Sequence, residues 1–202
     1  MADPQQPPLI LASASPRRME LLREADMAFE VVVPTIPEPD EVTNRLSPTQ
    51  QAEALAYFKA KTIRDLRPDA LVLGADTIVT LGGRILGKPA NIDDARRMLS
   101  SLSGTRHAVI TGVALIAPDG ERLLASEVTF VTMRKISPDE LEAYLASGEW
   151  SGKAGAYAIQ ETADRFVQNI EGSFSNIVGL PMELVGRMLE EIRHRPASRR
   201  SP

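Results

Sequence analysis

Short apolar runs and longer amphipathic stretches follow one another along this chain, and these two patterns are typical of strands and helices. The runs predict strands over residues 9–12, 29–33, 70–73, 77–80, 84–86, 107–117, 122–133 and 165–170. The amphipathic stretches predict helices over residues 16–25, 47–66, 91–104, 137–147 and 180–193. Because strands and helices mix without strict alternation, we expect an α/β fold whose sheet is mixed rather than purely parallel.

Capping and turn residues support these boundaries. Three predicted helices begin with serine followed by proline, at Ser15-Pro16, Ser47-Pro48 and Ser137-Pro138. Serine suits the N-cap and proline the first helical position. Asn91 caps a fourth helix, and Gly82-Gly83 between two apolar runs predicts a hairpin turn.

Composition narrows the class of protein. The chain has 202 residues, no cysteine, two histidines and a formal net charge of −4. We expect one domain over residues 1–202, with a core at about 8–194 and flexible tails at 1–7 and 195–202. The net charge argues against nucleic-acid or membrane partners, and no apolar run suits a membrane span or a signal peptide. We therefore expect a cytoplasmic protein.

The strand at 9–12 leads through small residues into a helix whose first turn holds Arg17 and Arg18. Cations at this end of a helix oppose its dipole, at a cost of about 0.3–1 kcal/mol each. A bound anion would reverse that cost, because N-termini of this kind collect phosphate groups. The two arginines are therefore either solvated surface side chains or part of an anion site.

Three further positions suggest a charged cleft. Lys59 falls within an apolar helical stripe whose members are Ala52, Leu55, Ala56, Ile63 and Leu66. Lys59 either extends along this surface to water or reaches an anion in a cleft. Asp76 ends an apolar run, where α/β proteins place ligand-binding groups, although aspartate is also a common turn residue. Glu38, near Asp40 and Glu41, either supplies a second metal-binding carboxylate or belongs to an acidic surface loop.

Residues 82–88 match the pattern G-x-x-x-x-G-K of phosphate-binding P-loops, but their context argues against one. Pro89 stands where a P-loop needs serine or threonine, and it lacks a backbone N–H. The segment also lies in a predicted hairpin rather than between a strand and a helix. Lys88 remains either a phosphate contact or an ordinary surface lysine.

A second glycine-rich segment covers residues 152–160. Its backbone can approach a ligand closely, Lys153 adds charge, and Gln160 can hydrogen-bond to the edge of a base. Residues 172–176 form either a similar loop or only the connection to the last helix. With two histidines and no cysteine, zinc sites and serine triads are disfavoured, so Mg²⁺ or Mn²⁺ held by oxygen ligands is the expected metal.

Five segments together give the chain a family resemblance. In chain order they are Ser13–Arg18, Gly74–Thr77, Lys88-Pro89, Lys153–Gln160 and Gly179–Pro181. Through these motifs the chain resembles the Maf family of nucleotide pyrophosphatases over most of its length. The resemblance implies an elongated mixed sheet with flanking helices and two lobes around a central cleft, as in inosine-triphosphate pyrophosphatases. It also implies a homodimer, a divalent cation (Mg²⁺ or Mn²⁺) and hydrolysis of a nucleoside triphosphate to monophosphate and pyrophosphate.

The resemblance also implies a role for each candidate residue. Asp76 is the expected proton acceptor and, with Glu38, the expected metal ligand. The expected phosphate contacts are Ser13, Arg18, Lys59, Lys88 and Lys153. At the three positions where the family's branches differ, the residues that resemble the branch acting on dTTP and UTP are Arg17, Thr77 and Gln160.

The leading interpretation is hydrolysis of dTTP, UTP and modified pyrimidine nucleotides by metal-assisted attack of water on the α-phosphorus. Hydrolysis of 7-methyl-GTP is the alternative within the family. The near match at residues 82–88 is the basis for a nucleotide kinase as a rival. A nucleotide-binding regulator of cell division without turnover is a further rival, because the family is linked to septum formation.

Overall fold

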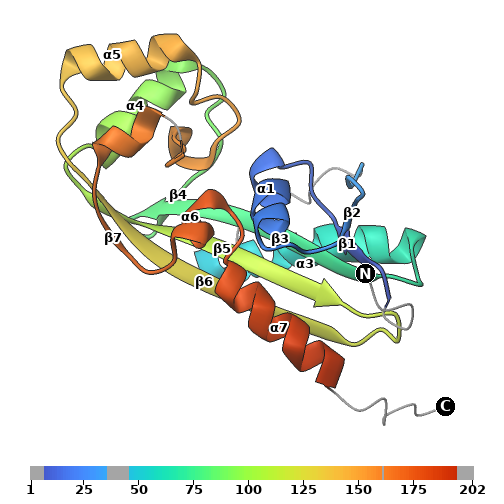
Figure 1. Ribbon diagram of the computed structural model, residues 1–202. Coiled ribbons are helices and arrows are strands. Elements are labelled where there is room, and N and C mark those ends of the chain that lie inside the picture. The colour runs from blue at the N-terminus through green and yellow to red at the C-terminus, as the bar shows by residue number, and fades with distance from the viewer. Residues whose placement is uncertain (1–6, 36–45, 161, 195–202) are drawn as a thin grey trace.

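The computed structural model describes residues 7–35, 46–160 and 162–194 (Figure 1). Its strands are β1 (Leu9–Leu11), β2 (Glu30–Val31), β3 (Leu71–Leu81), β4 (Arg84–Leu86), β5 (Arg106–Ile116), β6 (Arg122–Met133) and β7 (Val167–Glu171). Its helices are α1 (Pro16–Glu24), α3 (Pro48–Leu66), α4 (Ile92–Leu102), α5 (Pro138–Ser147), α6 (Phe174–Val178) and α7 (Met182–His194). Two short 3₁₀ turns are η1 (Ala154–Ala156) and η2 (Thr162–Phe166). Nearly all of the two predicted tails lies outside the described residues.

The strands of these ranges form one seven-stranded sheet in the order β2-β1-β3-β5-β6-β7, with β4 also paired to β3. β1 is parallel to β2 and β3, whereas the other pairs are antiparallel. α1 and α3 provide the crossovers that parallel neighbours require, and hairpins connect β3 to β4 and β5 to β6. The predicted mixed α/β sheet with flanking helices is confirmed.

Strand β3 (Leu71–Leu81) is longer than predicted, because the two strands predicted over residues 70–73 and 77–80 form one continuous strand. β5 pairs with it from Val72 to Thr80, which carries the strand through the segment that the sequence suggested as its end. On the opposite edge, β1 pairs as far as Leu73 and β4 pairs only from Val79 onward. Residues 74–78 therefore have no strand partner on that edge among the described strands. We call this gap the open edge of β3.

Helix α3 covers one face of the sheet at backbone contact distance. Its buried residues are Ala52, Ala56, Ala60 and Ile63. A β-carbon at Gly74 would lie 2.3 Å from the carbonyl oxygen of Ala56, and one at Gly112 would lie 2.2 Å from the carbonyl carbon of Ala52. Glycine at both positions therefore lets α3 approach this closely. Leu66 was expected in the apolar stripe but is 68% exposed, because α3 ends at this residue.

Two hydrophobic clusters cover the opposite face, one toward each end of the sheet (Figure 1). The first joins residues of α1 and α7 to Ala75 and Val113, and the second joins residues of α4, α5 and η1 to Val79 and Val109. Thr77 lies between them along β3 and belongs to neither cluster. The predicted two lobes are therefore two clusters built on one sheet, with the cleft between them at Thr77.

The short elements η1, η2 and α6 were not predicted, because three to five residues show too little periodicity to detect. Residues 172–176, left open as a ligand loop or a connection, include the start of α6. Ser173 caps this helix by accepting a hydrogen bond from the Asn176 N–H at 3.3 Å.

We expect Gly112→Ala to lower the free energy of unfolding by about 1–3 kcal/mol, because the added methyl group forces α3 away from the sheet. Denaturant titration of the variant and the wild type measures the difference. Gly186→Ala in α7 is the matched control, since a β-carbon there meets nothing within 4 Å. Unchanged stability of Gly112→Ala would contradict the backbone contact between α3 and β5.

Candidate active site

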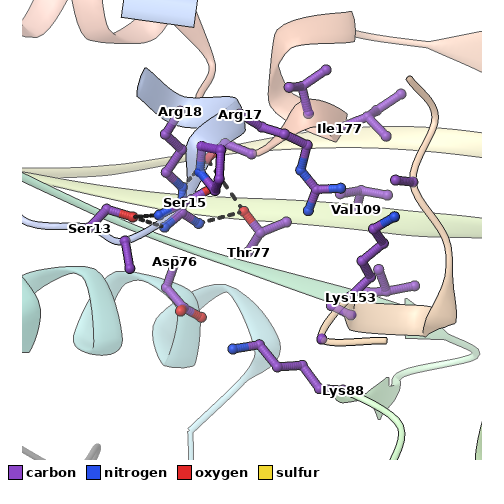
Figure 2. A pocket seen from close by; sticks show the side chains of 18 of the residues that line it. Ser13, Ser15, Arg17, Arg18, Asp76, Thr77, Lys88, Val109, Lys153 and Ile177 are labelled. Atoms are coloured by element: carbon purple, nitrogen blue, oxygen red, sulfur yellow. Dashed lines mark hydrogen bonds between the residues drawn. The ribbon is translucent and has the colours of Figure 1, made fainter. Parts of the chain in front are cut away.

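A cavity of about 610 Å³ lies beside the open edge of β3 (Figure 2). Its walls come from the turn after β1, the start of α1, the middle of α3, strand β3, the Lys88 loop, the η1 segment and the end of α6. The predicted site residues that line it are Ser13, Arg17, Arg18, Lys59, Asp76, Thr77, Lys88 and Lys153. Residues from both ends of the chain thus meet beside the open edge of β3, between the part of β3 that pairs with β1 and the part that pairs with β4.

On the α3 face of the sheet, Asp76 and Lys59 form an ion pair. Lys59 Nζ lies 2.5 Å from Asp76 Oδ1, and both side chains are 15% exposed. Asp76 lies opposite Gly112 in the register of β3 and β5, and it shares a face with Gly74. The close approach of α3 over the two glycines therefore brings Lys59 to Asp76. Lys59 thus lines the cavity beside Asp76, and its contact with a phosphate anion stays a prediction.

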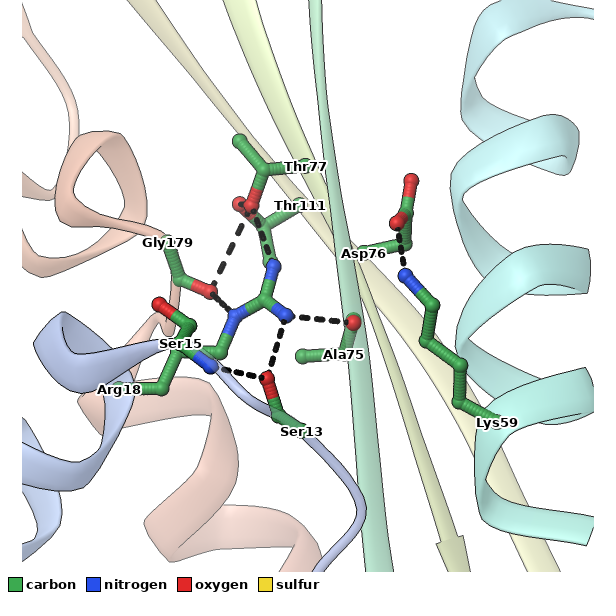
Figure 3. Close-up of polar contacts among 9 residues, drawn as sticks. All are labelled: Ser13, Ser15, Arg18, Lys59, Ala75, Asp76, Thr77, Thr111 and Gly179. Atoms are coloured by element: carbon green, nitrogen blue, oxygen red, sulfur yellow. Dashed lines mark hydrogen bonds and ion pairs between the residues drawn. The ribbon is translucent and has the colours of Figure 1, made fainter. Parts of the chain in front are cut away.

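Arg18 lies on the other side of β3 and is 9% exposed (Figure 3). Its Nε donates to the Gly179 carbonyl at 2.7 Å, and its Nη1 donates to Ser13 Oγ at 3.1 Å and to the Ala75 carbonyl at 2.9 Å. Its Nη2 donates to Thr77 Oγ1 at 3.1 Å. These bonds tie α1 to the turn after β1, to the open edge of β3 and to the residue that follows α6.

This geometry gives Arg18 a structural role that the sequence did not indicate. The Ala75 carbonyl points toward the open edge, where no described strand provides a donor, and Arg18 satisfies it instead. The guanidinium therefore orders the cavity wall through protein acceptors. Its contact with phosphate stays a prediction.

The remaining charged residues extend into the cavity from different walls (Figure 2). The Lys88 side chain extends toward the carboxylate of Asp76. Arg17 points away from Arg18, to the side of the cavity where Val109 and Lys153 lie. The cavity thus has one part with charged side chains near Asp76 and a second part where Arg17 lies beside the apolar side chains of Val109 and Ile177.

Two predicted residues are not placed in the cavity. Gln160 is exposed and follows the lining residue Ile159, but it does not itself line the cavity. Glu38 lies outside the described residues, as do its neighbours Asp40 and Glu41. Their roles in base recognition and metal binding stay predictions.

The near match to a P-loop is a hairpin, as expected. Gly82 and Gly83 have φ values of +57° and +83° and connect β3 to β4. Such a pair of left-handed residues is typical of a two-residue hairpin turn. Lys88 follows this hairpin and reaches the cavity from its own loop.

Thr77 continues the Arg18 network into the sheet, which the sequence analysis missed. Its Oγ1 shares a hydrogen bond with Thr111 Oγ1 at 2.9 Å, and Thr111 Oγ1 donates to the Asn176 carbonyl at 3.0 Å. The Asn176 amide donates in turn to the Val109 carbonyl at 3.1 Å and to Thr129 Oγ1 at 2.9 Å. Inward-facing threonines in apolar strands were the available signal, but threonine is also common on exposed strand faces.

A buried histidine and tyrosine were missed as well. His107 Nε2 lies 2.7 Å from the hydroxyl of Tyr157, which lines the cavity. Burial lowers the pKa of His107 to about 4, so its imidazole is neutral at pH 7. Burial also raises the pKa of Tyr157, so its phenol stays protonated. From the sequence alone, the two histidines are weighed only against zinc sites and serine triads, and His107 does not line the cavity.

The oxygen atoms that line this cavity suit a hard divalent cation, provided that oxygens of a bound substrate complete its coordination. Asp76 is the only carboxylate among the described lining residues, and the described part of the chain has no cluster of three histidine or acidic side chains. Mg²⁺ and Mn²⁺ are commonly held by one or two carboxylates together with phosphate oxygens. Lys59 bonds to Oδ1 of Asp76, which leaves Oδ2 as the oxygen for such a contact.

Five cationic side chains and one carboxylate line this cavity, which lies after the end of β1 and beside the middle of β3 in a mixed α/β sheet. Such a group of cations at a parallel strand pair is typical of the class of α/β proteins that bind nucleotides. The sequence matches the family described as "Maf-like protein" over residues 8–192, and the chain belongs to this family. No helix of the described ranges is long and apolar enough to span a membrane.

Curated relatives cover nearly the whole chain. A protein of Ruminiclostridium cellulolyticum is 43% identical over 190 residues, which are 93% of this chain and 97% of the relative. A protein of Moorella thermoacetica is 47% identical over 182 residues, which are 90% of this chain and 93% of the relative. Both relatives are named dTTP/UTP pyrophosphatase.

Among solved structures, a nucleoside-triphosphatase / dITP/XTP pyrophosphatase from Mycobacterium abscessus aligns with a TM-score of 0.40 and 18% identity. The alignment covers 63% of this chain and 74% of that chain. A likeness at this level carries no argument about the site.

Proposed function

We propose that this protein hydrolyses dTTP and UTP to the nucleoside monophosphate and pyrophosphate. The observation that carries the proposal is the cavity at the open edge of β3, where Asp76 lies among cationic side chains. The relatives named dTTP/UTP pyrophosphatase, at 43% and 47% identity over at least 90% of the chain, give the reaction and its substrates.

Charge balance supports a triphosphate as the ligand. The five cationic lining residues and Asp76 have a net charge of four positive, and a nucleoside triphosphate carries about four negative charges at neutral pH. Cations fixed in a cavity stabilise charge that develops on transferring phosphate groups, because they need no reorganisation during the reaction. Lys59, Lys88 and Lys153 are the proposed phosphate contacts, together with Ser13 and the charge of Arg18.

Asp76 is the proposed proton acceptor. It takes a proton from the attacking water while the water oxygen bonds to the α-phosphorus and the bond to the α–β bridging oxygen breaks. The leaving pyrophosphate takes the electron pair of that bond, and the positive charges of Lys88 and Lys153 offset its charge. Lys59 orients the carboxylate of Asp76 before the reaction through their ion pair.

Asp76, together with the oxygens of the substrate phosphates, would hold a divalent cation here. When bound, Mg²⁺ or Mn²⁺ supplies Lewis-acid polarisation of the α-phosphate and lowers the pKa of water. Glu38 is the proposed second carboxylate for the cation.

Base choice is assigned to Arg17, Thr77 and Gln160. Arg17 extends over the apolar part of the cavity, where a base has room (Figure 2). Thr77 Oγ1 bonds to Arg18 and Thr111, so we assign it an indirect effect on the shape of this part. The homodimer and the cytoplasmic location stay predictions of the sequence.

A substrate panel with product identification tests the proposal. Purified protein is incubated with dTTP, UTP and 7-methyl-GTP in Mg²⁺ or Mn²⁺, and the products are resolved by ion exchange. We expect equal amounts of monophosphate and pyrophosphate from dTTP and UTP. Orthophosphate as the first product would refute attack at the α-phosphorus, and preferred turnover of 7-methyl-GTP would refute the assigned branch. Binding without hydrolysis would favour a regulator, and phosphate transfer to a nucleotide would favour a kinase.

A further inference from the structure

The segment that brings Lys153 to the cavity has an unusual backbone. In η1, Gly155 and Ala156 have φ values of +69° and +64°, both in the left-handed region. For alanine this conformation costs roughly 1–2 kcal/mol, so it persists only where surrounding contacts fix it. At Gly155 a β-carbon would lie 3.0 Å from Cγ1 of Val79, so the segment also packs tightly onto β3.

Three hydrogen bonds join this segment to other parts of the chain. The Gly155 N–H donates to the Gly87 carbonyl at 3.0 Å, which ties η1 to the residue before Lys88. The hydroxyl of Tyr144 donates to the Ala156 carbonyl at 3.4 Å. Directly after the left-handed pair, the hydroxyl of Tyr157 is joined to His107 Nε2 at 2.7 Å. The bond to His107 is the shortest of the three.

The position of His107 is fixed by the sheet, so its end of this hydrogen bond cannot shift easily. It lies on the central strand β5 and is 2% exposed, and Tyr157 is 5% exposed. Their rings meet edge to face, with centroids 5.5 Å apart and an interplanar angle of 90°. Within the described residues, the other ring nitrogen of His107, Nδ1, is buried and has no hydrogen-bond partner. Leaving a buried nitrogen unsatisfied is costly, so the position of this ring needs an explanation beyond packing.

We infer that His107 is a positioning residue for the cavity: through Tyr157 it fixes the strained η1 segment, and thereby the placement of Lys153 and the Lys88 loop. His107 itself does not line the cavity, whereas Tyr157, Lys153 and Lys88 do. The inference rests on the proposed function only in assigning these two lysines to the phosphate groups of a nucleotide.

The test compares Tyr157→Phe, His107→Leu and the double variant in steady-state hydrolysis of dTTP. Each single variant is expected to raise KM about threefold to tenfold, the effect of one hydrogen bond, and to lower kcat by a smaller factor, because Lys88 and Lys153 also offset the charge of the leaving pyrophosphate. The double variant is expected to match the single variants, because both changes remove the same bond. His107→Gln places an amide near the position of Nε2 and is expected to recover part of the lost affinity. Where His107→Leu does not fold, Tyr157→Phe and His107→Gln carry the comparison.

Two matched controls and a binding measurement complete the experiment. His194→Gln and Tyr57→Phe change a histidine and a tyrosine that do not line the cavity, and both are expected to keep the wild-type KM. Lower melting temperatures with an unchanged KM in the variants would overturn the inference, as would additive effects in the double variant. Calorimetric titration with inorganic pyrophosphate separates the two proposals. If the wild type hydrolyses no triphosphate, the proposed function fails, and weaker pyrophosphate binding by Tyr157→Phe still supports the role of His107.

Discussion

Asp76→Asn is expected to lower kcat for dTTP about 10²- to 10⁴-fold, the usual contribution of a general base. Asparagine has nearly the same shape and can still accept the hydrogen bond of Lys59 through Oδ1, so the fold and the position of α3 are retained. What the variant lacks is an anionic oxygen to take the proton of water and to contact a divalent cation. Steady-state kinetics and a thermal melt of the same preparation measure the two effects.

The matched control for this prediction is Asp65→Asn on the exposed side of α3. Asp65 pairs with Lys61, and both side chains are about half exposed, at 60% and 48%. An exposed pair of this kind contributes little, so kcat is expected to stay at the wild-type value. A wild-type kcat in Asp76→Asn would remove Asp76 from the mechanism. Loss of triphosphate binding in that variant would instead assign it to substrate binding.

Local sequence signals were enough for most of the fold. The capping boxes at Ser47 and Ser137 both form, and helices α3 and α5 start where they indicate. These boundaries depend on neighbouring residues only, which is why they can be predicted. The continuity of β3 could not be predicted, because pairing with β5 carries the strand past Asp76 and that pairing is not local.

The candidate site also has features that the local sequence could predict and features that it could not. The position of Lys59 within an apolar stripe indicated a cleft, and the structure brings it to Asp76. Their distance depends on Gly74 and Gly112, which allow α3 to touch the sheet, and nothing local in the sequence links these glycines to α3. The hydrogen bond between His107 and Tyr157 joins residues 50 positions apart, so it could not be predicted from the local sequence either.

For Arg18, the role that the sequence indicated differs most from the contacts that the structure shows. Its position in the first turn of α1 suggested a donor for anions. Its acceptors include Ala75 and Gly179, which lie 57 and 161 positions away along the chain. A planar guanidinium with donors in a fixed fork suits such a set of acceptors, and a single ammonium group cannot replace it.

Arg18→Lys is therefore expected to lower the free energy of unfolding by about 3 kcal/mol, because the buried carbonyl groups of Ala75 and Gly179 lose their hydrogen bonds to the guanidinium. It should also lower kcat/KM for dTTP and UTP alike, since the Ser13 turn and the open edge of β3 lose their common anchor. Denaturant titration gives the change in stability, and kinetics with both substrates gives the second effect.

Arg17→Lys is the control beside it. Arg17 is only half-buried and extends into the cavity, so this change is expected to alter stability by less than about 1 kcal/mol and to shift the preference between dTTP, UTP and 7-methyl-GTP. Thr77→Val, which removes one acceptor of Arg18, should reproduce part of the loss of stability. Wild-type stability of Arg18→Lys, combined with weaker binding of every triphosphate, would contradict the anchoring role and assign Arg18 to the phosphate groups alone.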